Sequence, residues 1–129
     1  MVNRYKVFVV DDEPVFLKMI EDELSDNHKL EIKTFLSGED CILQLHEKPD
    51  IVVLDHNLER ESKSNLNGLK LLDIIRKNQP EVHAIILSGQ LMPDIIFDFI
   101  MGKGVDKYIV KGEDAFEQLN EAILNIISK

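Results

Sequence analysis

Charged and hydroxyl side chains follow directly on four short apolar runs of this 129-residue chain. They are Asp11, Asp12 and Glu13 after the first of these runs, Asp55 after the second, Ser88 after the third and Lys111 after the fourth. Carboxylates repel one another, so a cluster of them resists ionisation unless a cation offsets the charge. A hard divalent cation with oxygen ligands would do so, and an ammonium beside it suits an anionic group such as phosphate.

Magnesium fits these residues better than zinc, because neither histidine nor cysteine is among them. His56 follows Asp55, but one histidine without partners is poor evidence for a transition metal. Taken singly, each feature has an ordinary interpretation, since an acidic pair after a strand is commonly a solvated turn or a helix cap. Their coincidence after four apolar runs favours a functional site.

The elements that must position these residues follow from the apolar pattern. Runs rich in β-branched and aliphatic residues predict five strands, over Lys6–Val10, Leu30–Phe35, Ile51–Leu54, Ala84–Leu87 and Lys107–Val110. Apolar residues at helical spacing predict helices over Pro14–Leu24, Ser37–His46, Gly68–Asn78, Pro93–Met101 and Ala115–Ser128. This alternation predicts an α/β fold, a doubly wound parallel sheet of five strands with five helices on its two faces. Functional groups of such sheets collect at the carboxyl ends of the strands.

Composition narrows the class of protein. The length suits one domain, and the net charge of −9 argues against a nucleic-acid surface. No apolar run approaches the roughly 18 residues that span a membrane, and the start of the chain has no signal core, so a cytoplasmic location is expected. Cys41 precedes Ile42 and Leu43, which predicts a buried rather than a reactive thiol.

The motifs together resemble the receiver (CheY-like) domains of two-component response regulators. The resemblance runs from about Tyr5 to Ile127 and rests on the segments 9–14 (VVDDEP), 51–55 (IVVLD), 86–89 (ILSG) and 108–111 (YIVK), with Gly68. It implies the flavodoxin-like strand order 2-1-3-4-5, the order known for CheY. It also implies a single receiver domain over residues 1–129, with no output domain in the chain.

The resemblance implies a role for each matching residue. Asp55 would be the phosphorylated nucleophile, assisted by Lys111 and Ser88. Mg²⁺ would be bound by Asp11, Asp12, Asp55 and the backbone carbonyl of Asn57. Ser88 and Tyr108 would form the switch that responds to phosphorylation.

The implied function is that of a response regulator receiver domain in a phosphorelay. A histidine kinase or histidine phosphotransfer protein would supply the phosphoryl group, and a downstream effector protein or domain would respond. Such a domain is a phosphoacceptor rather than an enzyme, with at most self-catalysed phosphorylation and dephosphorylation. The face of the fourth helix, fifth strand and fifth helix could form a homodimer, and Phe97 on the fourth helix is expected on a partner or dimer surface.

Two features depart from the family pattern. Gly112 follows Lys111 where the family commonly has a proline, often after a cis peptide bond. A cis bond before a non-proline residue costs about 2.5–4 kcal/mol, so a trans bond is expected here. The stretch 56–67 is longer than usual and polar, and it is expected to be a loop that covers the acidic pocket or meets a kinase.

Two other interpretations compete with this one. A pseudo-receiver would have the same fold without phosphorylation and would act as a protein-interaction module. A haloacid dehalogenase-type phosphatase also uses aspartate and Mg²⁺, but its nucleophile follows the first strand in an Asp-x-Asp pattern. Asp55 follows the third predicted strand, and the complete set of acidic, hydroxyl and ammonium groups argues for a working receiver.

Overall fold

The computed structural model describes residues 4–55, 68–89 and 101–128, and its described strands form one parallel sheet. The strands are β1 (Tyr5–Val10), β2 (Leu30–Phe35), β3 (Ile51–Asp55), β4 (His83–Ser88) and β5 (Lys107–Val110). They pair in parallel in the order β2-β1-β3-β4-β5, so the predicted fold class and strand order are confirmed.

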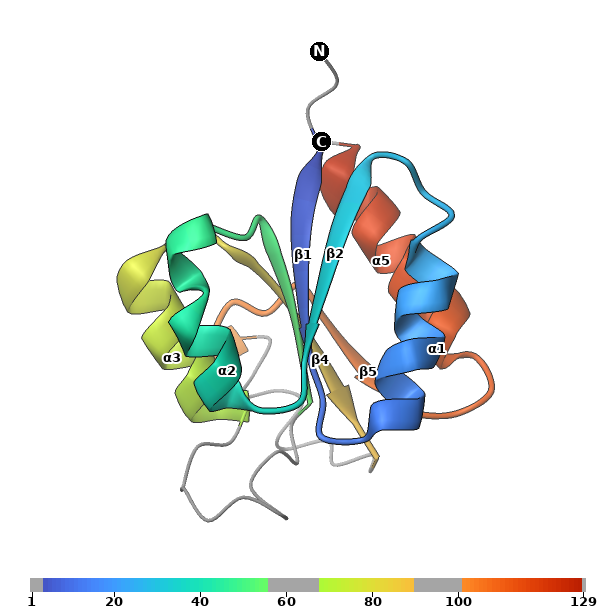
Figure 1. Ribbon diagram of the computed structural model, residues 1–129, viewed down its shortest axis with the longest axis horizontal. Helices are drawn as coiled ribbons and strands as arrows, with labels where there is room; N and C mark the ends of the chain where they lie inside the picture. The colour runs from blue at the N-terminus through green and yellow to red at the C-terminus, as the bar shows by residue number, and fades with distance from the viewer. Residues whose placement is uncertain (1–3, 56–67, 90–100, 129) are drawn as a thin grey trace.

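Helices cover both faces of this sheet (Figure 1). One face carries α2 (Gly38–Leu43), the short 3₁₀ helix η1 (Leu45–Glu47) and α3 (Gly68–Asn78), and the other carries α1 (Pro14–Leu24) and α5 (Ala115–Ile127). The helix predicted over Pro93–Met101 lies, except for its last residue, outside the described residues, and so does Phe97. Within the described part of the chain, no helix combines the length and apolarity needed to cross a bilayer.

Alternation along the strands builds two separate cores. Val7 and Val9 of β1 pack with α1 and α5, whereas Phe8 and Val10 point to α2 and α3. The central strand β3 is buried along its whole length, as the continuous apolar run predicted. Since both faces are covered, the strands have little freedom to slip, and the residues at their ends have defined positions.

The predicted helix Ser37–His46 is shorter than expected. Ser37 is the N-cap, and its hydroxyl oxygen accepts a hydrogen bond from the Asp40 N–H at 3.2 Å. The helix ends at Leu43, and the chain tightens into η1 before Lys48 reverses it in the left-handed region at φ 55°. The apolar spacing continues through this tighter turn, so periodicity alone could not locate the end.

Candidate functional site: the carboxyl edge of the sheet

The sheet's hydrogen bonds align the strand ends that carry the predicted site residues. The Asp11 N–H donates to the Phe35 carbonyl oxygen at 3.1 Å, which places Asp11 one residue beyond β1. Asp55 is the last residue of β3, and its register partner is Leu87 of β4. The Lys111 N–H donates to the Ser88 carbonyl oxygen at 2.7 Å, so Lys111 lies beside the end of β4. All these groups therefore share one edge, at the lower end of the strands in Figure 1.

Four carboxylates meet at this edge. One oxygen from each of Asp11, Asp12, Glu13 and Asp55 lies within 4.8 Å of those of the other three. Asp11 and Asp55 are buried, Asp12 is half-buried and Glu13 is exposed. The cluster thus has a buried floor and an open rim, so an ion or a small anion could enter from solvent.

Lys111 is the cation that faces this cluster. Its Nζ lies 2.9 Å from Asp11 Oδ2, 3.0 Å from Glu13 Oε1 and 3.6 Å from Asp55 Oδ2, and its side chain is 14% exposed. Burial lowers the pKa of Lys111, but the nearby carboxylates of Asp11, Asp55 and Glu13 outweigh this, and its pKa is raised. The ammonium is therefore permanently charged near neutral pH.

Asp11 is a buried carboxylate whose pKa differs from its ordinary value. Burial first, and then the charge of Asp55, raise the pKa of Asp11 from 3.8 to about 6. The Lys111 ammonium and the Glu13 N–H, which donates to Asp11 Oδ1 at 2.9 Å, act in the opposite direction. The Lys111 ammonium therefore does not fully offset the burial of Asp11 and the charge of Asp55.

A divalent cation bound by oxygen fits these residues. The ligand atoms available are carboxylate oxygens, the ligands that Mg²⁺ prefers. Asp11, Asp12 and Asp55 are the side chains that would hold it, while Asn57, the fourth predicted ligand, lies outside the described residues. Such an ion would neutralise negative charge on the carboxylates and on any phosphate group brought to them.

The two predicted switch residues are both buried. Ser88 ends β4 and is 1% exposed. Tyr108 of β5 belongs to the core on the α2 and α3 side, together with Leu72, Ile75 and Val105. Ser88 lies at the edge of the sheet that carries the site, where its register partner is Val110. Tyr108 lies two residues before Val110 on β5 and so is further from that edge.

The sequence interpretation missed two contacts of Lys111. Glu13 was noted after the first strand but was given no role, although its carboxylate lies 3.0 Å from Lys111 Nζ. Phe16 of α1 lies under the same ammonium, 4.6 Å from Nζ to the ring centroid. An aromatic residue in an amphipathic helix resembles any core residue, so only the position of Lys111 shows this contact.

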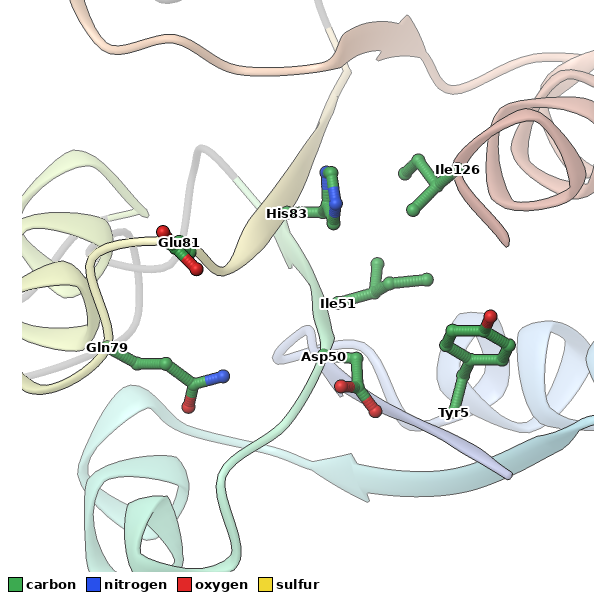
Figure 2. Close-up of a pocket in the computed structure, with 7 residues that line it drawn as sticks. All are labelled: Tyr5, Asp50, Ile51, Gln79, Glu81, His83 and Ile126. Atoms are coloured by element: carbon green, nitrogen blue, oxygen red, sulfur yellow. The ribbon is translucent and has the colours of Figure 1, made fainter. Parts of the chain in front are cut away.

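A cavity of about 390 Å³ lies at the opposite, amino end of the strands (Figure 2). Two of its ionisable groups, Asp50 and His83, make contacts at the starts of strands. The Asp50 Oδ2 accepts from the Lys6 N–H at 2.8 Å, and His83 Nδ1 lies 3.2 Å from Asp106 Oδ1. Figure 2 shows Tyr5, Ile51 and Ile126 on one side of the cavity, and we assign it no chemical role.

A family model and two curated proteins match the sequence of this chain. A family model described as the response regulator receiver domain matches residues 7–124. The nitrogen assimilation regulatory protein NtrX of Azorhizobium caulinodans is 30% identical over 86 residues, which are 66% of this chain and 18% of that protein. A protein-glutamate methylesterase/protein-glutamine glutaminase of Clostridium acetobutylicum is 27% identical over 119 residues, 90% of this chain and 33% of that protein.

A solved structure agrees in fold over nearly the whole chain. The BeF₃-activated receiver domain of DrrB, a Thermotoga maritima protein, has a TM-score of 0.82 and 27% identity, with 98% of this chain and 99% of that chain covered. The chain spans about a fifth to a third of the curated relatives it matches. Its sequence, its strand order and its acidic edge therefore agree: the chain belongs to the response regulator receiver domain family.

Proposed function

We propose that the chain accepts a phosphoryl group on Asp55 in a Mg²⁺-dependent reaction and changes a partner-binding surface in response. The observation that carries this proposal is the convergence of four carboxylates and the Lys111 ammonium at one edge. We take Asp55 as the nucleophile because the resemblance to receiver domains gives this role to the aspartate that ends the third strand. Lys111 Nζ, 3.6 Å from Asp55 Oδ2, is near enough to assist it.

In the proposed reaction, Asp55 Oδ attacks the phosphorus of a phosphohistidine. The P–N bond breaks as the O–P bond forms, so the imidazole leaves with its electron pair and an acyl phosphate remains. Phosphoryl transfer depends mainly on positioning and on neutralisation of charge. Asp11 and Asp12 would hold the Mg²⁺ that provides part of this neutralisation, and the Lys111 ammonium would pair with a phosphoryl oxygen.

The response would begin at Ser88. Phosphorylation adds roughly −1.5 to −2 charges and three acceptor oxygens, and the Ser88 hydroxyl at the end of β4 could donate to one of them. Tyr108 would then change rotamer and alter the surface of β5 and α5. In the structure the Tyr108 ring is buried in the core on the α2 and α3 side.

The proposed partners follow from the reaction. A histidine kinase or a phosphotransfer protein would donate the phosphoryl group, and an effector protein or domain, or a second copy of the chain, would bind the altered surface. The chain itself would remain a signalling phosphoacceptor. The roles proposed for Asn57 and for the stretch 56–67 concern residues outside those described.

Intact-mass analysis after treatment with acetyl phosphate and Mg²⁺ tests the proposal. The wild-type chain should gain about 80 Da, and Asp55→Asn should gain nothing. Asp22→Asn is the matched control, because this carboxylate on α1 is 65% exposed and pairs only with the exposed Lys18 among the contacts described. It should gain the same mass as the wild type.

A mass gain in Asp55→Asn would refute the assignment of the phosphoacceptor. If the wild type gained no mass and bound no beryllofluoride in the presence of Mg²⁺, the pseudo-receiver would be the correct interpretation. Excess EDTA should abolish the gain, since the carboxylates would then lack the ion that offsets their charge.

A further inference from the structure

The Lys111 ammonium lies between carboxylates and an aromatic ring. Its Nζ is 2.9 Å from Asp11 Oδ2 and 4.6 Å from the centroid of the Phe16 ring. In the same position it is 3.6 Å from Asp55 Oδ2. The ring therefore contacts the ammonium while the ammonium is at the proposed phosphoacceptor, and not in a retracted position.

The backbone around Lys111 does not by itself fix the position of the Lys111 ammonium, so contacts such as these must do so. The Lys111 backbone is held by its N–H bond to the Ser88 carbonyl oxygen at 2.7 Å, but four flexible methylene groups separate this backbone from Nζ. Gly112 follows through a trans peptide bond, and a Cβ at Gly112 would meet no atom of the described residues within 4 Å. Packing against Gly112 by the described residues therefore does not hold the chain next to Lys111.

The Phe16 ring is itself well anchored. It lies in the first turn and a half of α1 and packs against the Phe116 ring of α5, with ring centroids 5.3 Å apart and planes at 31°. Both rings belong to the edge of the core on the α1 and α5 side. The Phe16 ring therefore has a packing partner of its own while its π face lies under the ammonium, and such a face attracts an ammonium electrostatically.

We propose that Phe16 is a positioning residue of the receiver site, which holds the Lys111 ammonium in place for the phosphoryl group. This inference rests on the proposed function, because it assumes that Lys111 pairs with a phosphoryl oxygen. Phe16 acts on the ammonium, whereas Mg²⁺ would be held by carboxylates. Removing the π face should therefore weaken phosphoryl binding and leave Mg²⁺ binding nearly intact.

The test measures two affinities on the full chain: Mg²⁺ alone by calorimetry, and beryllofluoride at saturating Mg²⁺ by ¹⁹F NMR. Phe16→Leu keeps an apolar side chain of similar bulk without the π face, and Phe16→Tyr keeps the ring. We expect Phe16→Leu to weaken beryllofluoride binding about three- to tenfold and Phe16→Tyr to stay within about twofold of wild type. The Mg²⁺ affinity of both variants should change less than about twofold.

Phe116→Leu is the matched control for packing, since it removes the ring behind Phe16 rather than the one under the ammonium. It should change beryllofluoride affinity less than Phe16→Leu does. In a Lys111→Ala background, Phe16→Leu should have no further effect, because the group it positions is gone.

Equal losses for Phe16→Leu and Phe116→Leu, or an undiminished loss in the Lys111→Ala background, would overturn the inference and make Phe16 a packing residue. Failure of the proposed function has a different signature, because the wild type would then bind no beryllofluoride. Normal binding by the wild type with an unaffected Phe16→Leu variant would refute only the role of Phe16.

Discussion

Asp11 shows how burial and charge oppose each other at a single residue. It is fully buried and contacts the only cation described at the site, yet its pKa is raised to about 6. An exposed carboxylate beside lysine would normally be ionised well below this pH. The loss of water on burial and then the charge of Asp55 explain the higher pKa of Asp11, and a bound divalent ion would offset both by stabilising the charged carboxylates.

This raised pKa predicts a pH dependence for Mg²⁺ binding. Protons compete with the ion for Asp11, and they do so below pH 6 because the carboxyl holds its proton up to about that pH. The apparent Kd for Mg²⁺ should rise about tenfold between pH 7 and pH 5. Calorimetric titration at a series of pH values measures this, and an affinity that stays constant down to pH 5 would contradict it.

Residue types at strand ends could be predicted, but their pairwise contacts could not. The sequence placed Asp11, Asp55, Ser88 and Lys111 at one edge because strand ends follow directly from apolar runs. It did not place Glu13 or Phe16 against Lys111, since those contacts depend on the orientation of α1 relative to β5. The burial of Cys41, by contrast, could be predicted from its apolar neighbours, and the structure confirms it. Burial raises the pKa of the Cys41 thiol to about 12, which keeps it in the unreactive protonated form near neutral pH.

At the scale of elements, the strands were predicted more accurately than the segments that join them. Each described strand lies within one residue of its predicted bounds, because a buried strand is a short apolar run that polar residues terminate. Arg76 illustrates what such patterns miss. It lies on the polar side of α3, but it donates hydrogen bonds to the carbonyl oxygens of Lys103 and, at 3.1 Å, Gly104, and thereby holds the entry to β5.

Alanine substitutions at two glycines next to β5 should change the free energy of unfolding in opposite directions. Gly112 has no left-handed backbone angle and open space at its Cβ, so Gly112→Ala should raise the free energy of unfolding by about 0.4–1 kcal/mol through the unfolded chain. Gly104 has φ +63°, so Gly104→Ala should lower it by about 1–2 kcal/mol. Urea denaturation of both variants measures the difference, and shifts of the same sign would contradict the described backbone.

For the molecule as a whole, the buried carboxylates at the carboxyl edge of the sheet lower the free energy of unfolding. The two cores on either side of the sheet stabilise it, while the buried charge of Asp11 destabilises it when no divalent ion is bound. A carboxyl whose folded pKa is raised contributes stability that is fully present below its ordinary pKa of 3.8 and is lost as pH rises through about 6. In the ion-free chain this contribution of Asp11 to stability should therefore be lost between about pH 4 and pH 6.

Asp11→Asn should raise the free energy of unfolding of the ion-free chain while it weakens Mg²⁺ binding. In EDTA at pH 7 the variant should have a free energy of unfolding higher by roughly 1–2 kcal/mol, because removal of the buried charge exceeds the lost pairing with Lys111. Mg²⁺ should stabilise the wild type and not the variant. Asp12→Asn is the control, since Asp12 is only half-buried and its change in EDTA should be smaller.

At pH 5 the gap between Asp11→Asn and wild type should narrow, because the wild-type carboxyl is then mostly protonated. Denaturation curves at both pH values in EDTA test this. A variant that is less stable than wild type at both pH values would mean that the ion pair with Lys111 outweighs the burial of the charge.

The alignment of Asp55 with Leu87 has a consequence for how this chain can vary. Ladder hydrogen bonds set the position of Asp55 before the chain leaves β3. Insertions or deletions in the stretch 56–67, which follows Asp55 in the chain, should therefore leave the carboxylate in its place. A lineage could lengthen or shorten that connection to suit a new signalling partner while the reactive groups keep their mutual distances.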